Sequence, residues 1–172
     1  MYLYMQKETY HKIRNHVINS HLEGAAFAYA RSTKQNNSLV FECIDWDPVD
    51  DNEFESRSEF HLMLTDRMRA HIIKRAHDLW ASIVEFHSHS GHLPVKFSLS
   101  DLQGFSDFIP HVWWRLDGRP YVAVVFNESS FDGLIWHKKP TSPEQLKGII
   151  VNDQYLNPTK LTLKETNYDE FR

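Results

Sequence analysis

Two stretches of the chain repeat apolar residues with the period of an α-helix. In the first, Ile13, Val17 and Ile18 share one face of a helix expected from Tyr10 to about Ser20, with Thr9 as its N-cap. The second stretch begins after Thr65, which is also positioned to cap a helix. Its apolar stripe consists of Met68, Ile72, Ala76, Leu79 and Trp80. These two patterns predict two amphipathic helices that pack against a core.

The other apolar runs are short and rich in β-branched and aromatic residues, which is typical of strands. We expect strands over residues 1–5, 24–31, 39–46, 82–89, 111–116, 120–126 and 133–138. A third helix is expected over residues 100–108, where Ser100 is placed as a cap. The sequence "NNS" at 36–38 predicts a turn, and residues 45–59, with seven acids and one arginine, predict a solvated loop.

This alternation of helices and strands predicts an α/β fold. The connections are both short and long, so we expect a single domain with a mixed β-sheet flanked by helices. A length of 172 residues fits one domain. Residues 140–157 carry a mixed pattern, and the polar tail after them is expected to be loosely held.

Composition excludes several classes of function. The net charge is −4 and no dense run of Lys and Arg is present, so we expect no nucleic-acid partner. The longest apolar run, Tyr121 to Phe126, is too short to cross a bilayer, so we expect no membrane association. Cys43 is the single cysteine, which excludes an internal disulfide. The start lacks the pattern of a secretion signal, and we therefore expect a cytoplasmic protein.

The candidate chemistry lies in the stretch "HSHSGHLPVKFSLSD", residues 87–101. On a strand, side chains at positions i and i+2 point to the same face, so His87 and His89 project together with Cα atoms roughly 6.5–7 Å apart. That separation lets two imidazoles bind one metal ion. Asp101 lies where a loop ends and a helix begins, which makes it the candidate third ligand. Three protein ligands that leave one position for water are typical of catalytic zinc sites.

These residues resemble the signature of the JAMM (JAB/MPN) zinc metallopeptidases. That signature runs His-x-His, a spacer and Ser-x-x-Asp, with a glutamate far upstream; the matching residues here are His87, His89, Ser98, Asp101 and Glu23. One departure is that eight residues separate His89 from Ser98, where the family usually has seven. Ser90 also stands where proline is common. The resemblance implies the curved sheet of that family, which is cytidine-deaminase-like, with residues 1–140 as the metallopeptidase domain and 141–172 as its C-terminal extension.

The resemblance also implies a role for each residue. His87, His89 and Asp101 would bind Zn²⁺, and Glu23 would be the general base. Spacing alone leaves Glu85 as a competing base, because it lies two residues before His87 on the same strand face. Ser98 would donate a hydrogen bond to the oxyanion, while Ser100 would cap the following helix.

Hydrolysis of an amide or isopeptide bond follows from this resemblance. The family's typical substrate is the C-terminal tail of ubiquitin or a ubiquitin-like protein, cleaved after its last glycine. Short members of this kind are thought to work beside bacterial enzymes that resemble the ubiquitin-activating and ubiquitin-conjugating enzymes. Two adjacent tryptophans cannot both face the core from one strand, so either Trp113 or Trp114 is expected to face outward. That tryptophan is a candidate for binding the substrate, and a packed interface is an equal alternative.

Two other functions stay open at the level of sequence. The same site could hydrolyse small-molecule or sulfur-carrier conjugates, which would need no folded ubiquitin-like partner. A non-catalytic MPN-like scaffold that binds partners is the other alternative. Such scaffolds generally lack part of the metal set, whereas this chain retains all five positions.

Overall fold

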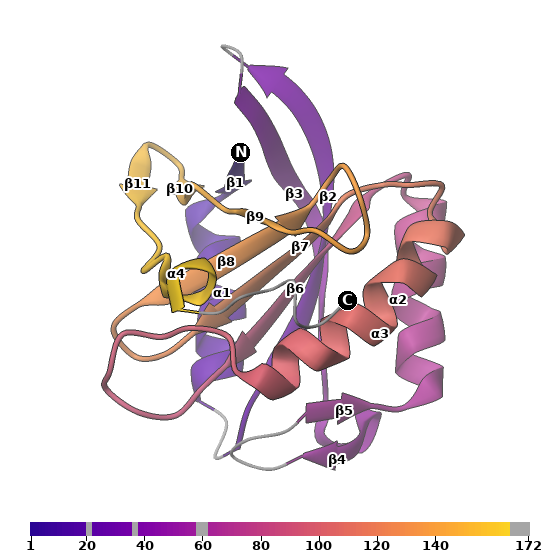
Figure 1. The fold of residues 1–172 in the computed structure, drawn as a ribbon, viewed down its shortest axis with the longest axis horizontal. Helices are drawn as coiled ribbons and strands as arrows, with labels where there is room; N and C mark the ends of the chain where they lie inside the picture. Colours follow the sequence, from indigo (N-terminus) through magenta and orange to yellow (C-terminus); the bar gives the residue numbers. More distant parts are fainter. Residues whose placement is uncertain (20–21, 36–37, 58–61, 166–172) are drawn as a thin grey trace.

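A nine-stranded mixed sheet forms the centre of the molecule in the computed structural model (Figure 1). The structure describes residues 1–19, 22–35, 38–57 and 62–165. The helices in these ranges are α1 (Lys7–Ile18), α2 (Asp66–Asp78), α3 (Leu99–Arg115) and α4 (Leu161–Glu165), with a short 3₁₀ turn at Asp51–Glu53. The strands of the large sheet are β1 (Tyr2–Met5), β2 (Ala25–Gln35), β3 (Ser38–Pro48), β6 (Ser82–Ser88), β7 (Tyr121–Phe126), β8 (Phe131–Trp136), β9 (Glu144–Gln145), β10 (Gly148–Val151) and β11 (Gln154–Leu156). The prediction of an α/β fold with a mixed sheet flanked by helices is confirmed.

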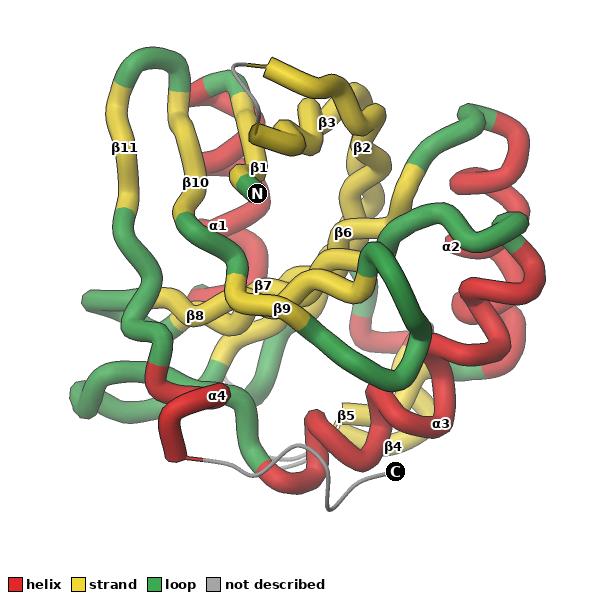
Figure 2. Tube along the Cα trace, turned by 45° about the horizontal axis from the view of Figure 1, so that its top comes forward, coloured by secondary structure: helices red, strands yellow, loops and turns green. Residues whose placement is uncertain are grey.

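The strand order is β11-β10-β1-β3-β2-β6-β7-β8-β9. Strand β1 runs parallel to both β10 and β3, and β6 runs parallel to β7, whereas the other neighbouring pairs are antiparallel. Strands β4 (Phe54–Arg57) and β5 (Leu62–Leu64) form a separate antiparallel pair. Figure 2 shows how strongly the large sheet curls, since β10 and β11 run upright in this view while β7 to β9 run across it.

Each face of the sheet buries its own apolar core. Helices α2 and α3 cover one face, where Met68, Ile72, Phe105 and Ile109 are buried against the sheet (Figure 1). Helix α1 covers the opposite face through Ile13 and Val17. Burial on both faces explains why β7 is a continuous apolar run, and β8 is likewise buried along its whole length although it contains Asp132.

The C-terminal part of the chain joins both edges of this sheet. Strand β9 pairs with β8 at one edge, and β10 pairs with β1 near the other. Asp132 on β8 is fully buried and accepts hydrogen bonds from the Lys160 amide (3.2 Å) and from both the amide and the hydroxyl of Thr162 (3.0 and 2.6 Å). Residues 141–165 are therefore built into the same sheet and core as the residues before them.

The sequence predicted the wrong element at residues 111–116. These residues complete α3 instead of forming a strand, because Leu102, Phe105, Ile109, Val112 and Leu116 continue one helical stripe that is buried against the sheet. Their β-branched and aromatic side chains favoured a strand, but tertiary packing outweighed that propensity.

Two other predictions about element bounds were wrong in part. Thr9 lies inside α1, which begins at Lys7 after Gln6, so it is not the N-cap. Residues 45–48 belong to β3 and residues 54–57 form β4, where a solvated loop was expected. By contrast, Thr65 caps α2 as predicted, because its hydroxyl accepts a hydrogen bond from the Met68 amide at 3.2 Å. Ser20 as a helix end, positions 36–37 of the predicted turn and the tail after 165 lie outside the described residues.

Within the described ranges, no helix has the length and apolar character needed to cross a membrane.

Candidate metal centre

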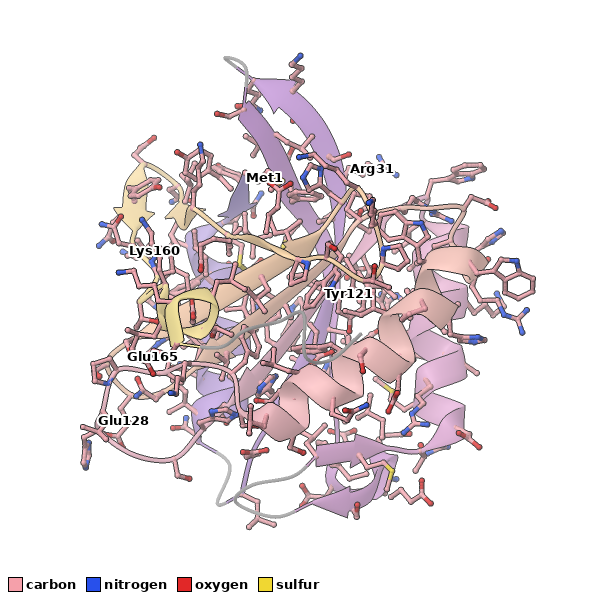
Figure 3. All side chains as sticks on the ribbon, in the orientation of Figure 1. Met1, Arg31, Tyr121, Glu128, Lys160 and Glu165 are labelled. Atoms are coloured by element: carbon pink, nitrogen blue, oxygen red, sulfur yellow. The ribbon has the colours of Figure 1, made fainter. Side chains whose placement is uncertain are left out.

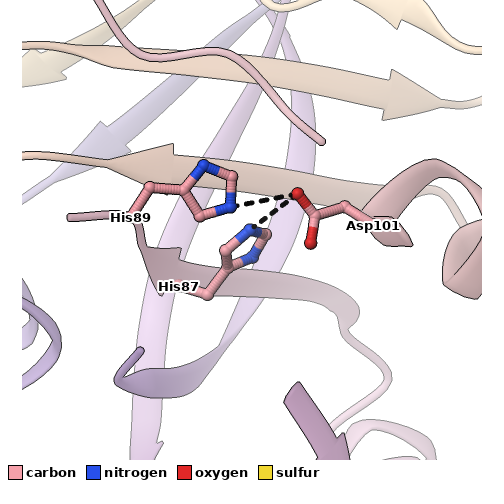
Figure 4. A group of neighbouring side chains, drawn as sticks. All are labelled: His87, His89 and Asp101. Carbon is pink, nitrogen blue, oxygen red and sulfur yellow. Dashed lines mark ion pairs between the residues drawn. The ribbon is translucent and has the colours of Figure 1, made fainter. Parts of the chain in front are cut away.

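The two histidines and the aspartate of the motif meet at one point (Figure 4). His87 lies near the end of β6, His89 follows that strand, and Asp101 lies in the first turn of α3. Asp101 Oδ2 is 3.6 Å from His87 Nε2 and 3.1 Å from His89 Nε2. One ligand atom from each residue lies within 4.8 Å of the other two. This group is compact enough to hold a single ion.

Hydrogen bonding within the group supports a fit to a metal ion. The Nε2 atoms of His87 and His89 are both buried, and among the described residues neither has a partner with hydrogen-bond geometry: each only approaches Asp101 Oδ2 as an ion pair. A buried polar nitrogen without a partner is unfavourable, so such atoms call for an explanation. Two imidazoles that direct bare nitrogens toward one carboxylate oxygen match the N and O ligands that Zn²⁺ takes in catalytic sites.

A capping box fixes the carboxylate of Asp101. The Ser98 hydroxyl accepts a hydrogen bond from the Asp101 amide (3.1 Å), and Asp101 Oδ2 accepts one from the Ser98 amide (2.7 Å). The prediction that Ser100 caps this helix is therefore wrong: Ser98 is the N-cap, and Ser100 is exposed. Capping uses the oxygen of Ser98 as an acceptor, so its hydroxyl hydrogen stays available as a donor.

Glu23 lies on the same side of the histidines as Asp101. Its Oε1 is 3.7 Å from His89 Nε2, and the residue is only 4% exposed. Ser88, between the two histidines, holds this segment in place: its hydroxyl accepts from the Gly24 amide (3.1 Å) and donates to the Val17 carbonyl at the end of α1 (2.5 Å). The roles of Ser88 and Gly24 were not predicted. The signal in the sequence was a small hydroxyl residue between the histidines and a glycine directly after Glu23.

The pKa values of two carboxylates and one imidazole of the site are shifted from their ordinary values. Burial raises the pKa of Glu23 to about 6, although the two neighbouring imidazoles oppose this shift. Burial also disfavours charge on Asp101, but His87 and His89 outweigh it and hold the pKa of Asp101 well below its ordinary value. Burial lowers the pKa of His87, but the carboxylates of Asp101 and Glu85 outweigh it and raise that pKa to about 10. The site thus attracts positive charge, and a bound cation would replace the imidazole proton.

Glu85 occupies the opposite side of the His87 ring. Its Oε1 lies 3.3 Å from His87 Nδ1, whereas Asp101 faces Nε2 of the same ring. The hydroxyl of Tyr121 donates a hydrogen bond to Glu85 Oε2. Burial, followed by the nearby Glu85 charge, raises the pKa of Tyr121 well above its ordinary value, so this hydroxyl stays a donor. Of the two acids considered as general base, Glu23 is therefore the one on the side of the bare nitrogens.

The loop between His89 and Ser98 is held from two directions. The Asn127 side chain donates to the carbonyls of Gly91 and Leu93 (3.3 and 2.6 Å). From the C-terminal segment, the Thr159 hydroxyl donates to the Val95 carbonyl (2.7 Å), and the Thr162 hydroxyl accepts from the Phe97 amide (3.0 Å). Sequence analysis missed these contacts because they join residues more than 30 positions apart.

His92 lies in the same loop but turns away from the metal centre. Its side chain is 89% exposed and pairs with Glu128, at 3.3 Å between Nδ1 and Oε2. His92 therefore faces solvent, which leaves three protein ligands at the candidate site among the described residues.

A cavity of about 1270 Å³ extends from the metal centre between α2 and α3. His87 and Asp101 line one part of it, while His77, His111 and Arg115 line a part nearer the C-terminal ends of the two helices. Trp113 and Trp114 are absent from the described residues that line it. Trp114 is 70% exposed, so one tryptophan does face outward. It does so from a helix, 13 residues and about 20 Å beyond Asp101. The structure therefore does not place either tryptophan at the edge of this site.

Comparisons with known proteins give a fold but no family. No family model matches the chain, and no curated protein matches it. The solution structure of protein DSY2949 from Desulfitobacterium hafniense is similar, with a TM-score of 0.53 and 14% identity over 88% of this chain and 94% of that one. The N-terminal domain of STIL from Trichoplax adhaerens has a TM-score of 0.33 and 6% identity over 74% of this chain and 36% of that one. At 14% identity the first likeness extends to the fold alone, and the second is too weak to carry an argument.

Proposed function

We propose that the protein is a zinc-dependent peptidase or isopeptidase of the JAMM type, which cleaves after the C-terminal glycine of a ubiquitin-like protein. The observation that carries this proposal is the pair of bare, buried Nε2 atoms of His87 and His89, which face Asp101 with Glu23 3.7 Å from His89. Three ligands and one adjacent acid make up the minimum set for metal-assisted hydrolysis.

The residues of the chain divide the chemical steps among them. When bound, Zn²⁺ supplies Lewis acidity, which lowers the pKa of water to about 7 and polarises the substrate carbonyl. Glu23 accepts the proton of the attacking water and delivers it to the leaving amine, a task that its position 3.7 Å from His89 Nε2 allows. Ser98 donates its hydroxyl hydrogen to the oxygen of the tetrahedral intermediate. Asp101 and the two histidines hold the ion.

The class of substrate follows from the resemblance to the family, and the cavity beside the site supports it. A cavity of about 1270 Å³ between α2 and α3 has room for a peptide tail next to the metal ligands. We propose that the protein acts in the cytoplasm on ubiquitin-like conjugates. Its proposed partners are bacterial enzymes that resemble the ubiquitin-activating and ubiquitin-conjugating enzymes.

A cleavage assay with three variants tests this function. Ubiquitin-like proteins fused at their C-terminal glycine to a reporter serve as substrates for zinc-loaded protein. Glu23→Gln should keep zinc and lose turnover by at least about 100-fold, because only the base is removed. Asp101→Ala should lose both zinc and turnover. His92→Ala is the matched control and should keep both, because that histidine is exposed and lies outside the ligand group.

The same experiment separates the alternatives. Wild-type protein that binds no zinc would favour a scaffold. Zinc-loaded protein that hydrolyses small conjugates, but no ubiquitin-like fusion, would favour the small-molecule or sulfur-carrier hydrolase. If Glu23→Gln kept full turnover on a fusion, Glu23 would lose its role as general base.

A further inference from the structure

Glu85 is a largely buried acid that the steps above do not use. It lies on β6 two residues before His87, and both side chains point to the face of the sheet that α3 covers. Its side chain is 15% exposed, and within the described ranges it forms no ion pair with a lysine or arginine. Burying a carboxylate is unfavourable unless it is paired or hydrogen-bonded, so the partners of Glu85 indicate what it does there.

Those partners are one metal-site histidine and one tyrosine. Glu85 Oε1 lies 3.3 Å from His87 Nδ1, and Glu85 Oε2 accepts the hydrogen bond from the Tyr121 hydroxyl. Figure 3 labels Tyr121, whose ring packs between Phe108 of α3 and Trp136 of β8, with ring centroids 6.3 and 6.1 Å away. Tyr121 is 1% exposed, so its hydroxyl has a fixed position.

The contact at Nδ1 decides what Nε2 can do. In a neutral imidazole one nitrogen carries the hydrogen and the other carries the lone pair. A carboxylate beside Nδ1 stabilises the hydrogen on that atom, which leaves the lone pair of His87 on Nε2. That nitrogen is the buried one that faces Asp101 without a hydrogen-bond partner.

We propose that Glu85, held in place by Tyr121, is a positioning residue that sets the tautomer and the ring orientation of His87 for metal binding. Carboxylates behind ligating histidines act in this way at other metal sites. The inference rests on the metal-binding part of the proposed function, but it does not depend on which substrate is cleaved.

Zinc affinity of two variants tests this role in the absence of substrate. Glu85→Gln keeps the size of the side chain but removes its charge, and Tyr121→Phe removes only the hydroxyl. Competition with a chromophoric chelator should show zinc binding about 10- to 100-fold weaker for Glu85→Gln. Tyr121→Phe should show a smaller loss, and the double variant should bind no more weakly than Glu85→Gln, because Tyr121 acts through Glu85. The visible absorption of bound Co²⁺ should shift in both single variants, since it reports ligand geometry.

Glu128→Gln is the matched control. Glu128 pairs with His92 at the same 3.3 Å, but both side chains are exposed, and Figure 3 shows Glu128 at the edge of the molecule. This variant should leave zinc affinity and the Co²⁺ spectrum unchanged.

Three outcomes would overturn the inference. The first is a folded Glu85→Gln variant that binds zinc with wild-type affinity. If that variant also lost turnover, Glu85 would become a candidate general base instead. The second outcome applies if Glu85→Gln fails to fold. In that case, wild-type zinc affinity together with an unchanged Co²⁺ spectrum in Tyr121→Phe would overturn the inference. The third is wild-type protein that binds no zinc, which would also remove the proposed function. Zinc binding that depends on Glu85, without cleavage of any fusion, would remove only the proposed reaction.

Discussion

At the scale of single residues, local rules predicted that His87, His89 and Asp101 converge, but not the contacts that hold them in place. The convergence of His87, His89 and Asp101 follows from the alternation of a strand and the start of a helix, both of which are visible in sequence. The contacts of Ser88 and Gly24 depend on α1 lying against β6, which no local spacing encodes. A sequence can therefore indicate a metal centre while leaving the position of its neighbouring acid to tertiary packing.

Gly24 is required for this packing, and its replacement gives a sharp prediction. A Cβ at Gly24 would lie 2.5 Å from the Val17 carbonyl oxygen and 2.9 Å from Val17 Cα, which are backbone atoms that cannot move aside alone. Gly24→Ala should lower the free energy of unfolding by about 1–3 kcal/mol, measured by urea denaturation. Gly104→Ala is the control: its Cβ would have no atom within 4 Å, so alanine in this helix should raise stability by about 0.5–1 kcal/mol. Equal effects of the two substitutions would contradict this account.

At the scale of elements, α3 shows where sequence patterns fail and where they succeed. Its start was predicted within two residues, because cap chemistry is local. Its last five residues, 111–115, were predicted as part of a strand, because tryptophan and valine favour strands when no packing is considered. The buried stripe from Leu102 to Leu116 decided the outcome through contact with the sheet. Sequence reasoning thus placed Asp101 correctly but misplaced the two tryptophans that follow it.

The capping box at the start of α3 should couple helix stability to metal binding. Ser98→Ala should lower the free energy of unfolding by about 1 kcal/mol, because the Asp101 amide loses its acceptor. It should also weaken zinc binding by about 3- to 10-fold, since the turn that carries the ligand is held less firmly. Thr65→Ala removes the corresponding cap of α2, which carries none of the ligands. It should cost a similar free energy and leave zinc affinity unchanged in chelator competition. Equal zinc affinity of the two variants would show that the cap does not position Asp101.

At the scale of the whole molecule, the candidate site joins parts of the chain that are far apart in sequence. Glu23 precedes β2, His87 lies on β6 and Asp101 begins α3, while Thr159 and Thr162 of the C-terminal segment hold the loop between the last two ligands. The mixed sheet and its strands β1, β2, β3, β6, β7 and β8 could be predicted from patterns, whereas β4, β5 and β9 to β11 could not. The order of the nine strands in the large sheet could not be predicted either, because pairing between β1 and β10 joins segments from nearly opposite ends of the chain.

Because its ligands come from separate elements, the metal ion should stabilise the entire fold. In the described ranges Glu23, Glu85 and Asp101 pair with the imidazoles of His87 and His89 and with no Lys or Arg, so the folded site offers a cation three carboxylates that the unfolded chain does not bring together. A ligand that binds only the folded state at 100 times its Kd adds about 2.7 kcal/mol. For a chain of this size that corresponds to a rise in Tm of about 5–10 °C.

Thermal unfolding of chelator-treated protein, with and without added Zn²⁺, measures this coupling. Added Zn²⁺ should raise the Tm by about that amount, and chelator should reverse the rise. His89→Ala should unfold at a Tm that no longer responds to zinc, because one of the three ligands is gone. His92→Ala should respond as wild type does, since its side chain is exposed and outside the site. A wild-type Tm that is indifferent to zinc would mean that the bare nitrogens of His87 and His89 serve something other than a metal ion, and the proposed hydrolysis would lose its physical basis.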